Sequence, residues 1–331
     1  MQVASSSLAR VRAFELSPRA FRVLALAAAA SLYAIVISGA TVRLTASGLG
    51  CESWPGCQAG SFFPESSHHG WIEFGNRAVA LFPLSLTLLA WLGARRTPGL
   101  SRAVAWIALA TFAGTLAQAP LGFVTIYFEL HPLLVLAHFL LALAVLAGAV
   151  VVGVHAWGND RGFADERPVR TTRAATLALL AAASALVVSG TLATAAGPHS
   201  GDPEVRRLGI LHDAVHLHVQ VSAAFAAVLA VTLVLLVRER RRFPGLLAVA
   251  ALLVGLLVAQ GVVGEVQWRT RLPWGLVLVH VALAAAVWAV TVAVAALAFR
   301  PLASLHASAH TLRESRTPSG SPSARHSSGH S

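Results

Sequence analysis

Two stretches of the chain decide its fold: residues 115–122 read TLAQAPLG, and residues 257–264 read LVAQGVVG. Each is followed at the same distance by an apolar segment with one histidine, VLAHFLLA around His138 and VLVHVALA around His280. The offset, 280 − 138, is 142 residues, and the same offset relates Asn76 to His218. The chain therefore contains an internal repeat with a matching pair of positions in each half. Histidines paired across helices inside a membrane indicate haem.

The composition is that of an integral membrane protein. Of the 331 residues, 56% are hydrophobic and 12% are charged, and the mean hydropathy is +0.70. The charged fraction is about half of the roughly 25% that is usual in soluble domains. Apolar runs of about 20 residues can cross a membrane as helices, and they lack the strong two-residue alternation of a membrane β-barrel. We therefore predict an all-α integral membrane protein.

The sequence predicts eight membrane spans and an orientation for them. The spans lie at about 21–43, 74–94, 103–125, 131–154, 174–195, 209–237, 244–266 and 276–299. All 25 basic residues are arginines, and this topology puts 19 of them on one side of the membrane. The positive-inside rule then places both termini in the cytoplasm of a cell-membrane protein. We interpret the net charge of +11 as a topology signal and a contact with lipid, not as nucleic-acid binding.

The repeat predicts two four-helix bundles of parallel topology, related by a pseudo-twofold axis along the membrane normal. The first span ends in Ile-Ser-Gly and the fifth in Val-Ser-Gly, so we interpret the first span as a retained helix rather than a signal peptide. The expected parts are a cytoplasmic segment 1–20, an N-terminal bundle 21–155 with an outer loop 44–72, a cytoplasmic linker 156–173, a C-terminal bundle 174–299 and a disordered cytoplasmic tail 300–331.

The repeat also selects which histidines are expected to bind haem iron. Polar groups within hydrocarbon are costly and usually face the interior of a bundle. His212 and His216 share one helix face, whereas His218 lies about 200° around the helix from His216. Because only His218 aligns with Asn76, we predict His218 and His280 as the ligand pair and keep His216 as the alternative.

Glu73 in the first half has no acidic counterpart at the equivalent position of the second half. Glu73 and Asn76 are expected on one helix face at the start of the second span, within WIEFGNR, and the residue that aligns with Glu73 is Val215. Glu73 could be a helix-terminal charge paired with Arg77, or a carboxylate that moves protons beside a buried ligand. The asymmetry is expected of two ancestral sites that diverged, one for electron transfer and one for chemistry.

The two cysteines, Cys51 and Cys57, lie in the first outer loop, in GCESWPGC. This loop is longer than its counterpart, with 37 residues from Gly39 to Asn76 against 28 from Gly190 to His218. Outside the cell a disulfide between the cysteines is chemically permitted. It would be a loop staple or a redox-active pair that exchanges with an external thiol system.

Together these features resemble the haem A synthase family, called CtaA in bacteria. The resemblance covers about residues 21–299 and rests on the Ser-Gly end of the first span, the SGLGCESWPGC loop, the Glu-x-x-x-Arg stretch, the paired Ala-Gln-x-x-(Leu/Val)-Gly segments and the late histidines. It implies an oxidoreductase that converts the C8 methyl group of haem O to a formyl group, giving haem A for terminal cytochrome oxidase. It also implies a disulfide between Cys51 and Cys57.

The resemblance implies roles for single residues as well. Haem b would have His218 and His280 as its axial ligands, and the substrate haem O would bind in the other half at His138, with Glu73 as the catalytic carboxylate. Many relatives have Glu-x-x-His-Arg where this chain carries Asn76, and asparagine is a poor ligand for haem iron. Either haem O keeps an open axial position beside Asn76, or the first site is degenerate.

The implied partners are haem O, a haem O synthase, cytochrome oxidase assembly proteins and membrane lipid, with a homo-oligomer left open. The rival interpretation is a non-catalytic b-type electron carrier or a haem-delivery protein, which would share the paired histidines. Glu73 and the longer cysteine loop favour the synthase, because a symmetric electron carrier needs neither in one half only. A transporter is disfavoured, because the spans lack an evident charged substrate site and broken helix pairs.

Overall fold

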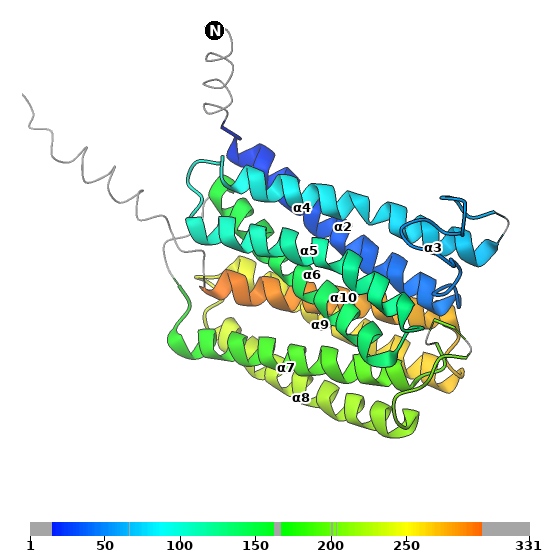
Figure 1. Ribbon diagram of the computed structural model, residues 1–331. Coiled ribbons are helices and arrows are strands. Elements are labelled where there is room, and N and C mark those ends of the chain that lie inside the picture. Colours follow the sequence, from blue (N-terminus) through cyan, green and yellow to red (C-terminus); the bar gives the residue numbers. More distant parts are fainter. Residues whose placement is uncertain (1–14, 66, 162–166, 200, 203, 300–331) are drawn as a thin grey trace, which may run out of the picture.

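The computed structural model describes residues 15–65, 67–161, 167–199, 201–202 and 204–299 (Figure 1). Within these ranges the helices are α2 (Pro18–Leu44), α3 (His68–Val79), α4 (Leu81–Ala94), α5 (Arg102–Tyr127), α6 (Pro132–Arg161), α7 (Arg170–Ala196), α8 (Leu211–Arg238), α9 (Pro244–Arg269) and α10 (Trp274–Phe299). The all-α prediction is confirmed. The expected disorder of the tail concerns residues 300–331, which lie outside the described residues.

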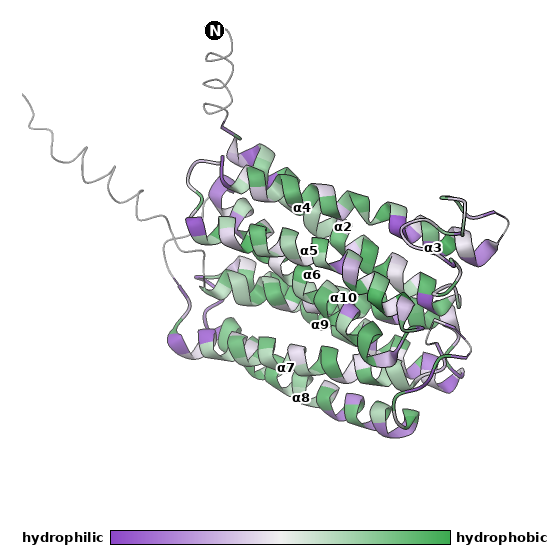
Figure 2. Ribbon diagram, viewed as in Figure 1, coloured by the Kyte–Doolittle hydropathy of each residue, from purple (hydrophilic) through white to green (hydrophobic). Residues whose placement is uncertain are grey.

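Eight helical segments in the described part of the chain are long and apolar enough to cross a membrane. Figure 2 shows their apolar middle stretches side by side, with the hydrophilic residues gathered at the two ends of the helices. Local capping fixes several of the starts: the Ser17 and Ser101 hydroxyls accept hydrogen bonds from the first turns of α2 and α5, and Pro244 opens α9. The predicted number and order of spans are thereby confirmed.

The second span differs from its prediction. Its helix begins at His68 rather than near residue 74, because the Ser67 hydroxyl caps it by accepting a hydrogen bond from the Gly70 amide at 3.2 Å. The helix is interrupted at Ala80, between α3 and α4, where Pro83 has no amide hydrogen to donate to the preceding turn. Glu73 therefore lies inside α3, not at its start as expected.

The helices pack in two groups that meet along α6 and α10. In the first group α2 packs against α4 and α6, and α5 packs against the same two helices. In the second group α7 packs against α8 and α10, and α9 packs against α10. Helix α10 also contacts α6 and α2, which places α6 and α10 at the junction of the groups (Figure 1).

Hydrogen bonds between distant residues join the two groups. The Tyr33 hydroxyl donates to the Ala282 carbonyl at 3.0 Å, and the Trp288 indole N–H donates to the Leu143 carbonyl at 2.8 Å. At the end of α2, the Arg43 guanidinium donates to the carbonyl of His199, which follows α7, at 2.8 Å. Apolar surroundings offer these polar groups no water, so the bonds fix how the groups of helices sit together.

The junction can be tested through Trp288. We expect Trp288→Phe to lower the free energy of unfolding by about 1 kcal/mol, because the indole donor is lost and the Leu143 carbonyl keeps one partner fewer. Trp106→Phe is the matched control, since the Trp106 side chain is 69% exposed. Thermal unfolding of both variants in the same detergent measures the difference; equal midpoints would contradict a stabilising role for the bond.

Candidate functional site

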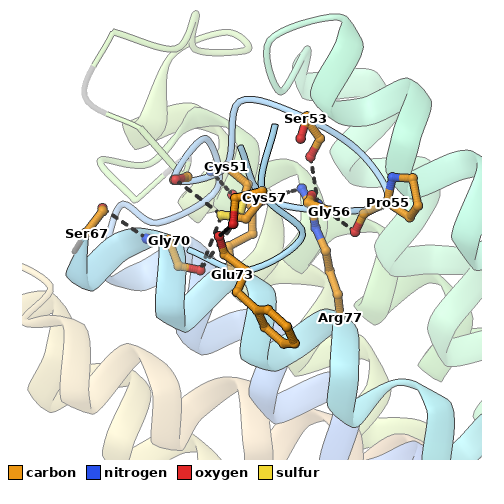
Figure 3. The surroundings of a disulfide bond; sticks show 12 residues. Cys51, Ser53, Pro55, Gly56, Cys57, Ser67, Gly70, Glu73 and Arg77 are labelled. Atoms are coloured by element: carbon orange, nitrogen blue, oxygen red, sulfur yellow. Dashed lines mark hydrogen bonds and ion pairs between the residues drawn. A yellow bond between two sulfur atoms is a disulfide. The ribbon is translucent and has the colours of Figure 1, made fainter. Parts of the chain in front are cut away.

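The loop between α2 and α3 is closed by a disulfide. Cys51 and Cys57 are joined with an S–S distance of 2.08 Å, and both are buried (Figure 3). Inside the loop, the Glu52 amide donates to the Cys57 carbonyl at 2.7 Å, and the Cys57 amide donates to the Phe62 carbonyl at 3.2 Å. The pairing of the two cysteines, which the sequence permitted and the resemblance implied, is therefore present, and it shapes a compact loop.

Glu73 joins this loop to α3. Its side chain is buried, and its two carboxylate oxygens have different partners: Oε2 accepts a hydrogen bond from the Cys51 amide at 2.9 Å, and Oε1 accepts one from Arg77 at 2.5 Å (Figure 3). A buried carboxylate is tolerated only with such donors. The carboxylate thus lies directly beneath the disulfide, in contact with the backbone of one of its cysteines.

Arg77, one turn beyond Glu73 on α3, binds the backbone of the cysteine loop. Besides pairing with Glu73, its guanidinium donates to the carbonyls of Ser53 at 2.9 Å and Gly56 at 2.6 Å (Figure 3). The ion pair with Glu73, one of the two alternatives that the sequence left open for this carboxylate, is present, and the loop contacts were not predicted. Guanidinium groups offer several donors in a fixed plane, so one arginine can hold both a carboxylate and two carbonyls.

The other polar residues predicted for the first half, Asn76 and His138, each have a buried atom without a partner. The Asn76 Oδ1 and the His138 Nδ1 make no hydrogen bond with any described residue. Gln118 donates from its amide to the His138 carbonyl at 3.3 Å, while its own Oε1 is also buried and unpaired. Buried polar atoms normally have partners, so these unpaired groups are compatible with the ligand site that the sequence predicts here.

In the second half the predicted histidine pair comes together. The imidazole rings of His218 on α8 and His280 on α10 have centroids 6.4 Å apart, and their planes are inclined by 74°. Two imidazole nitrogens on opposite sides of one metal ion lie about 4 Å apart, and each ring centre lies further out, so this separation fits a single iron between the rings. The residues present therefore fit a bis-histidine haem.

The helices around the pair orient both rings. The Ser189 Oγ lies 3.0 Å from the His218 Nδ1, which leaves the opposite ring nitrogen for a metal. Glycine lies behind each ring: a Cβ on Gly190 would be 3.0 Å from His218 Cε1, and one on Gly264 would be 3.1 Å from His280 Cε1. Any side chain at these glycines would displace the imidazole.

Three other histidines, His131, His212 and His216, lie on exposed surface. His212 and His216 contact each other, with ring centroids 4.7 Å apart, and both are exposed, whereas His218 is half-buried. His131 is exposed just before α6. His218, rather than the alternative His216, is thus the partner of His280. Ser189 was missed by the sequence reasoning, although the Val-Ser-Gly motif that contains it was noted there.

The fold and the site define a class: an eight-span helical membrane protein with paired histidines in one group of helices and a disulfide-tied carboxylate in the other. The family model described as cytochrome oxidase assembly protein, COX15-CtaA, matches residues 22–292, so the chain belongs to this family. The family expected from the sequence motifs is confirmed.

Three relatives, each named heme A synthase, show how far the similarity extends. The protein of Symbiobacterium thermophilum is 33% identical over 153 residues, covering 45% of this chain and 49% of the relative. That of Bacillus pumilus is 29% identical over 140 residues, covering 41% and 44%. That of Shewanella oneidensis is 24% identical over 289 residues, covering 74% and 87%. The chain therefore matches about half the length of the first two relatives and most of the third.

The packing of the cysteine loop against α3 can be tested by a substitution at Gly50. A Cβ there would lie 2.5 Å from the carbonyl carbon of His69, so we expect Gly50→Ala to lift the loop and break the bond between Cys51 and Glu73. The buried disulfide should then react faster with a mild reductant, measured by thiol labelling. Gly75→Ala is the control, because no neighbouring atom lies within 4 Å of a Cβ at that site in α3. Equal labelling of both variants would contradict the prediction.

Proposed function

We propose that this protein is a haem A synthase, an oxidoreductase that converts the C8 methyl group of haem O to a formyl group and so supplies haem A for terminal cytochrome oxidase. Family membership and the names of the three relatives support the proposal. The observation that carries it is the buried Glu73 carboxylate, tied to the cysteine loop in the group of helices that also holds His138 and Asn76.

The proposed architecture follows the repeat. Residues 21–155 and 174–299 would form two pseudo-symmetric bundles in the cell membrane, with both termini in the cytoplasm. The packing of α2 and α4–α6 as one group and of α7–α10 as another supports this division. A haem O synthase would deliver the substrate, and cytochrome oxidase assembly proteins would receive the product.

We propose His218 and His280 as the axial ligands of a resident haem b. The ring separation, the hydrogen bond between the Ser189 Oγ and the His218 Nδ1 and the glycines behind both rings support this role. When bound, haem b would supply electron transfer between the two halves. The two histidines hold it in place, and Ser189 sets the tautomer of His218.

In the other half, haem O would bind with His138 on its iron and Asn76 on the opposite side. Because asparagine coordinates haem iron weakly, His138 would be the only firm protein ligand of the substrate. Glu73 would accept and deliver protons near the reacting carbon of the substrate. The Cys51 amide and Arg77 position this carboxylate.

The function is tested by extracting the haems of the purified protein from cells that also express a haem O synthase. Haem A together with haem b is the expected result. Haem b alone, with haem O supplied and unconverted, would contradict the synthase and favour the electron carrier or haem-delivery protein.

The role of Glu73 leads to a separate prediction. Glu73→Gln should keep haem b, which binds in the other half, while haem A formation falls by about 100-fold or more, as is usual when a proton-transferring group is lost. Glu52→Gln changes an exposed residue of the cysteine loop, and this variant should behave as wild type. Chromatography of extracted haems measures both, and a normal rate in Glu73→Gln would disprove the proton role.

The haem b ligands can be tested independently of activity. His218→Ala and His280→Ala should each abolish the b-type absorbance of the purified protein, because one imidazole cannot hold the iron as a bis-histidine site does. Ser189→Ala should weaken haem b binding by about tenfold, since it removes the hydrogen bond that orients His218. His216→Ala is the control on the exposed face of α8, and loss of the spectrum in that variant would contradict the assignment.

A further inference from the structure

An open cavity of about 550 Å³ lies among the residues that connect α7 to α8 and α9 to α10. Leu211, which lines it, precedes His218 by seven residues on α8, or about 10 Å along the helix axis. Trp268, which also lines it, is one turn beyond Gly264, the glycine behind His280. The cavity therefore lies on the outer side of the histidine pair and on the same helices.

Two arginines give this largely apolar cavity its charge. The Arg207 guanidinium donates to the Gly197 carbonyl at 2.6 Å, which fixes it at the wall. The Arg271 side chain is exposed and makes no hydrogen bond or ion pair with another described residue. An apolar recess with guanidinium groups at its outer end fits a flat apolar ligand that carries carboxylates on one edge.

The turn that presents Arg271 has a counterpart of opposite charge in the first half. Arg271 and Leu272 have φ angles of +63° and +60°, and Glu129 and Leu130, 142 residues earlier, have +49° and +57°. The hydrogen bonds match as well: the Leu272 amide donates to Gln267 at 2.7 Å, and the Leu130 amide donates to Thr125 at 2.8 Å. The same backbone turn thus carries a base after α9 and an acid after α5.

We propose that Arg207 and Arg271 bind the propionate carboxylates of the haem held by His218 and His280, and that Glu129 denies such an anchor to the haem in the first half. This inference rests on the proposed function. It would explain why two similar sites retain similar ligands differently. Haem b, bound by arginines in the second half, would stay, whereas haem O, which lies near Glu129 in the first half, would enter and leave.

The test compares haem retention in two charge reversals. Arg271→Glu introduces a glutamate into the turn after α9. The equivalent turn after α5 already has a glutamate, Glu129, with a similar φ angle, so we expect the fold to tolerate the change. The holoprotein in nanodiscs is mixed with excess apomyoglobin, and haem b transfer is followed by absorbance. We expect transfer to be about tenfold faster than in wild type, with a larger difference at low salt.

Arg206→Glu is the matched control. It makes the same change of charge at the neighbouring position, which is exposed and does not line the cavity, so the wild-type rate of transfer is expected. The reciprocal variant, Glu129→Arg, should leave haem b transfer unchanged and slow the release of haem O from the first half.

Three outcomes separate the inference from its premises. If Arg271→Glu keeps the b-type spectrum and loses haem at the wild-type rate, the anchor is wrong although the proposed function stands. If wild-type protein contains no haem b, the proposed function itself fails. If the effect of Arg271→Glu is present only in nanodiscs with anionic lipid and vanishes in zwitterionic lipid, the arginines bind a lipid phosphate and the propionate assignment is overturned.

Discussion

Hydrocarbon cannot hydrogen-bond to polar groups, and this constraint governs every polar side chain in the structure. Helices satisfy the backbone, so only a few side chains remain to be paired. Some join helices, as Tyr33 and Trp288 do across the junction of the two groups. Others have a buried atom without a partner, as the Asn76 Oδ1 and the His138 Nδ1 do. The paired groups hold the bundle together, and in the proposed enzyme these two unpaired groups would face the substrate.

Glu73 shows how one buried charge organises a whole region. Its carboxylate needs donors, and it finds them in the Cys51 amide and in Arg77. Arg77 in turn binds the Ser53 and Gly56 carbonyls, so the disulfide-closed loop is fastened to α3 by the same charges that keep the carboxylate buried. In the proposed enzyme, loop, carboxylate and substrate site therefore form one connected unit, and the second half, with Val215 in place of the acid, has no equivalent.

Much of this was accessible from the sequence. The length and apolarity of the runs determine eight spans, and the repeat picked His218 over His216 without knowledge of side-chain directions. The predicted start of the second span is too late because the residues from His68 to Gly70 are not apolar, while the Ser67 hydroxyl caps a helix that begins there. The hydropathy of a segment does not reveal a helical turn that is stabilised by a loop packed against it.

The sequence by itself determined the helices and their order and predicted that His218 and His280 form a pair, because these depend on apolar length and on a spacing repeated within one chain. Only the tertiary structure decided that Arg77 holds the cysteine loop, that Ser189 contacts His218 and that Arg271 shares a cavity with Arg207. These contacts join residues on different segments. Their existence depends on how helices pack and where loops fold back, which no periodicity along the chain encodes.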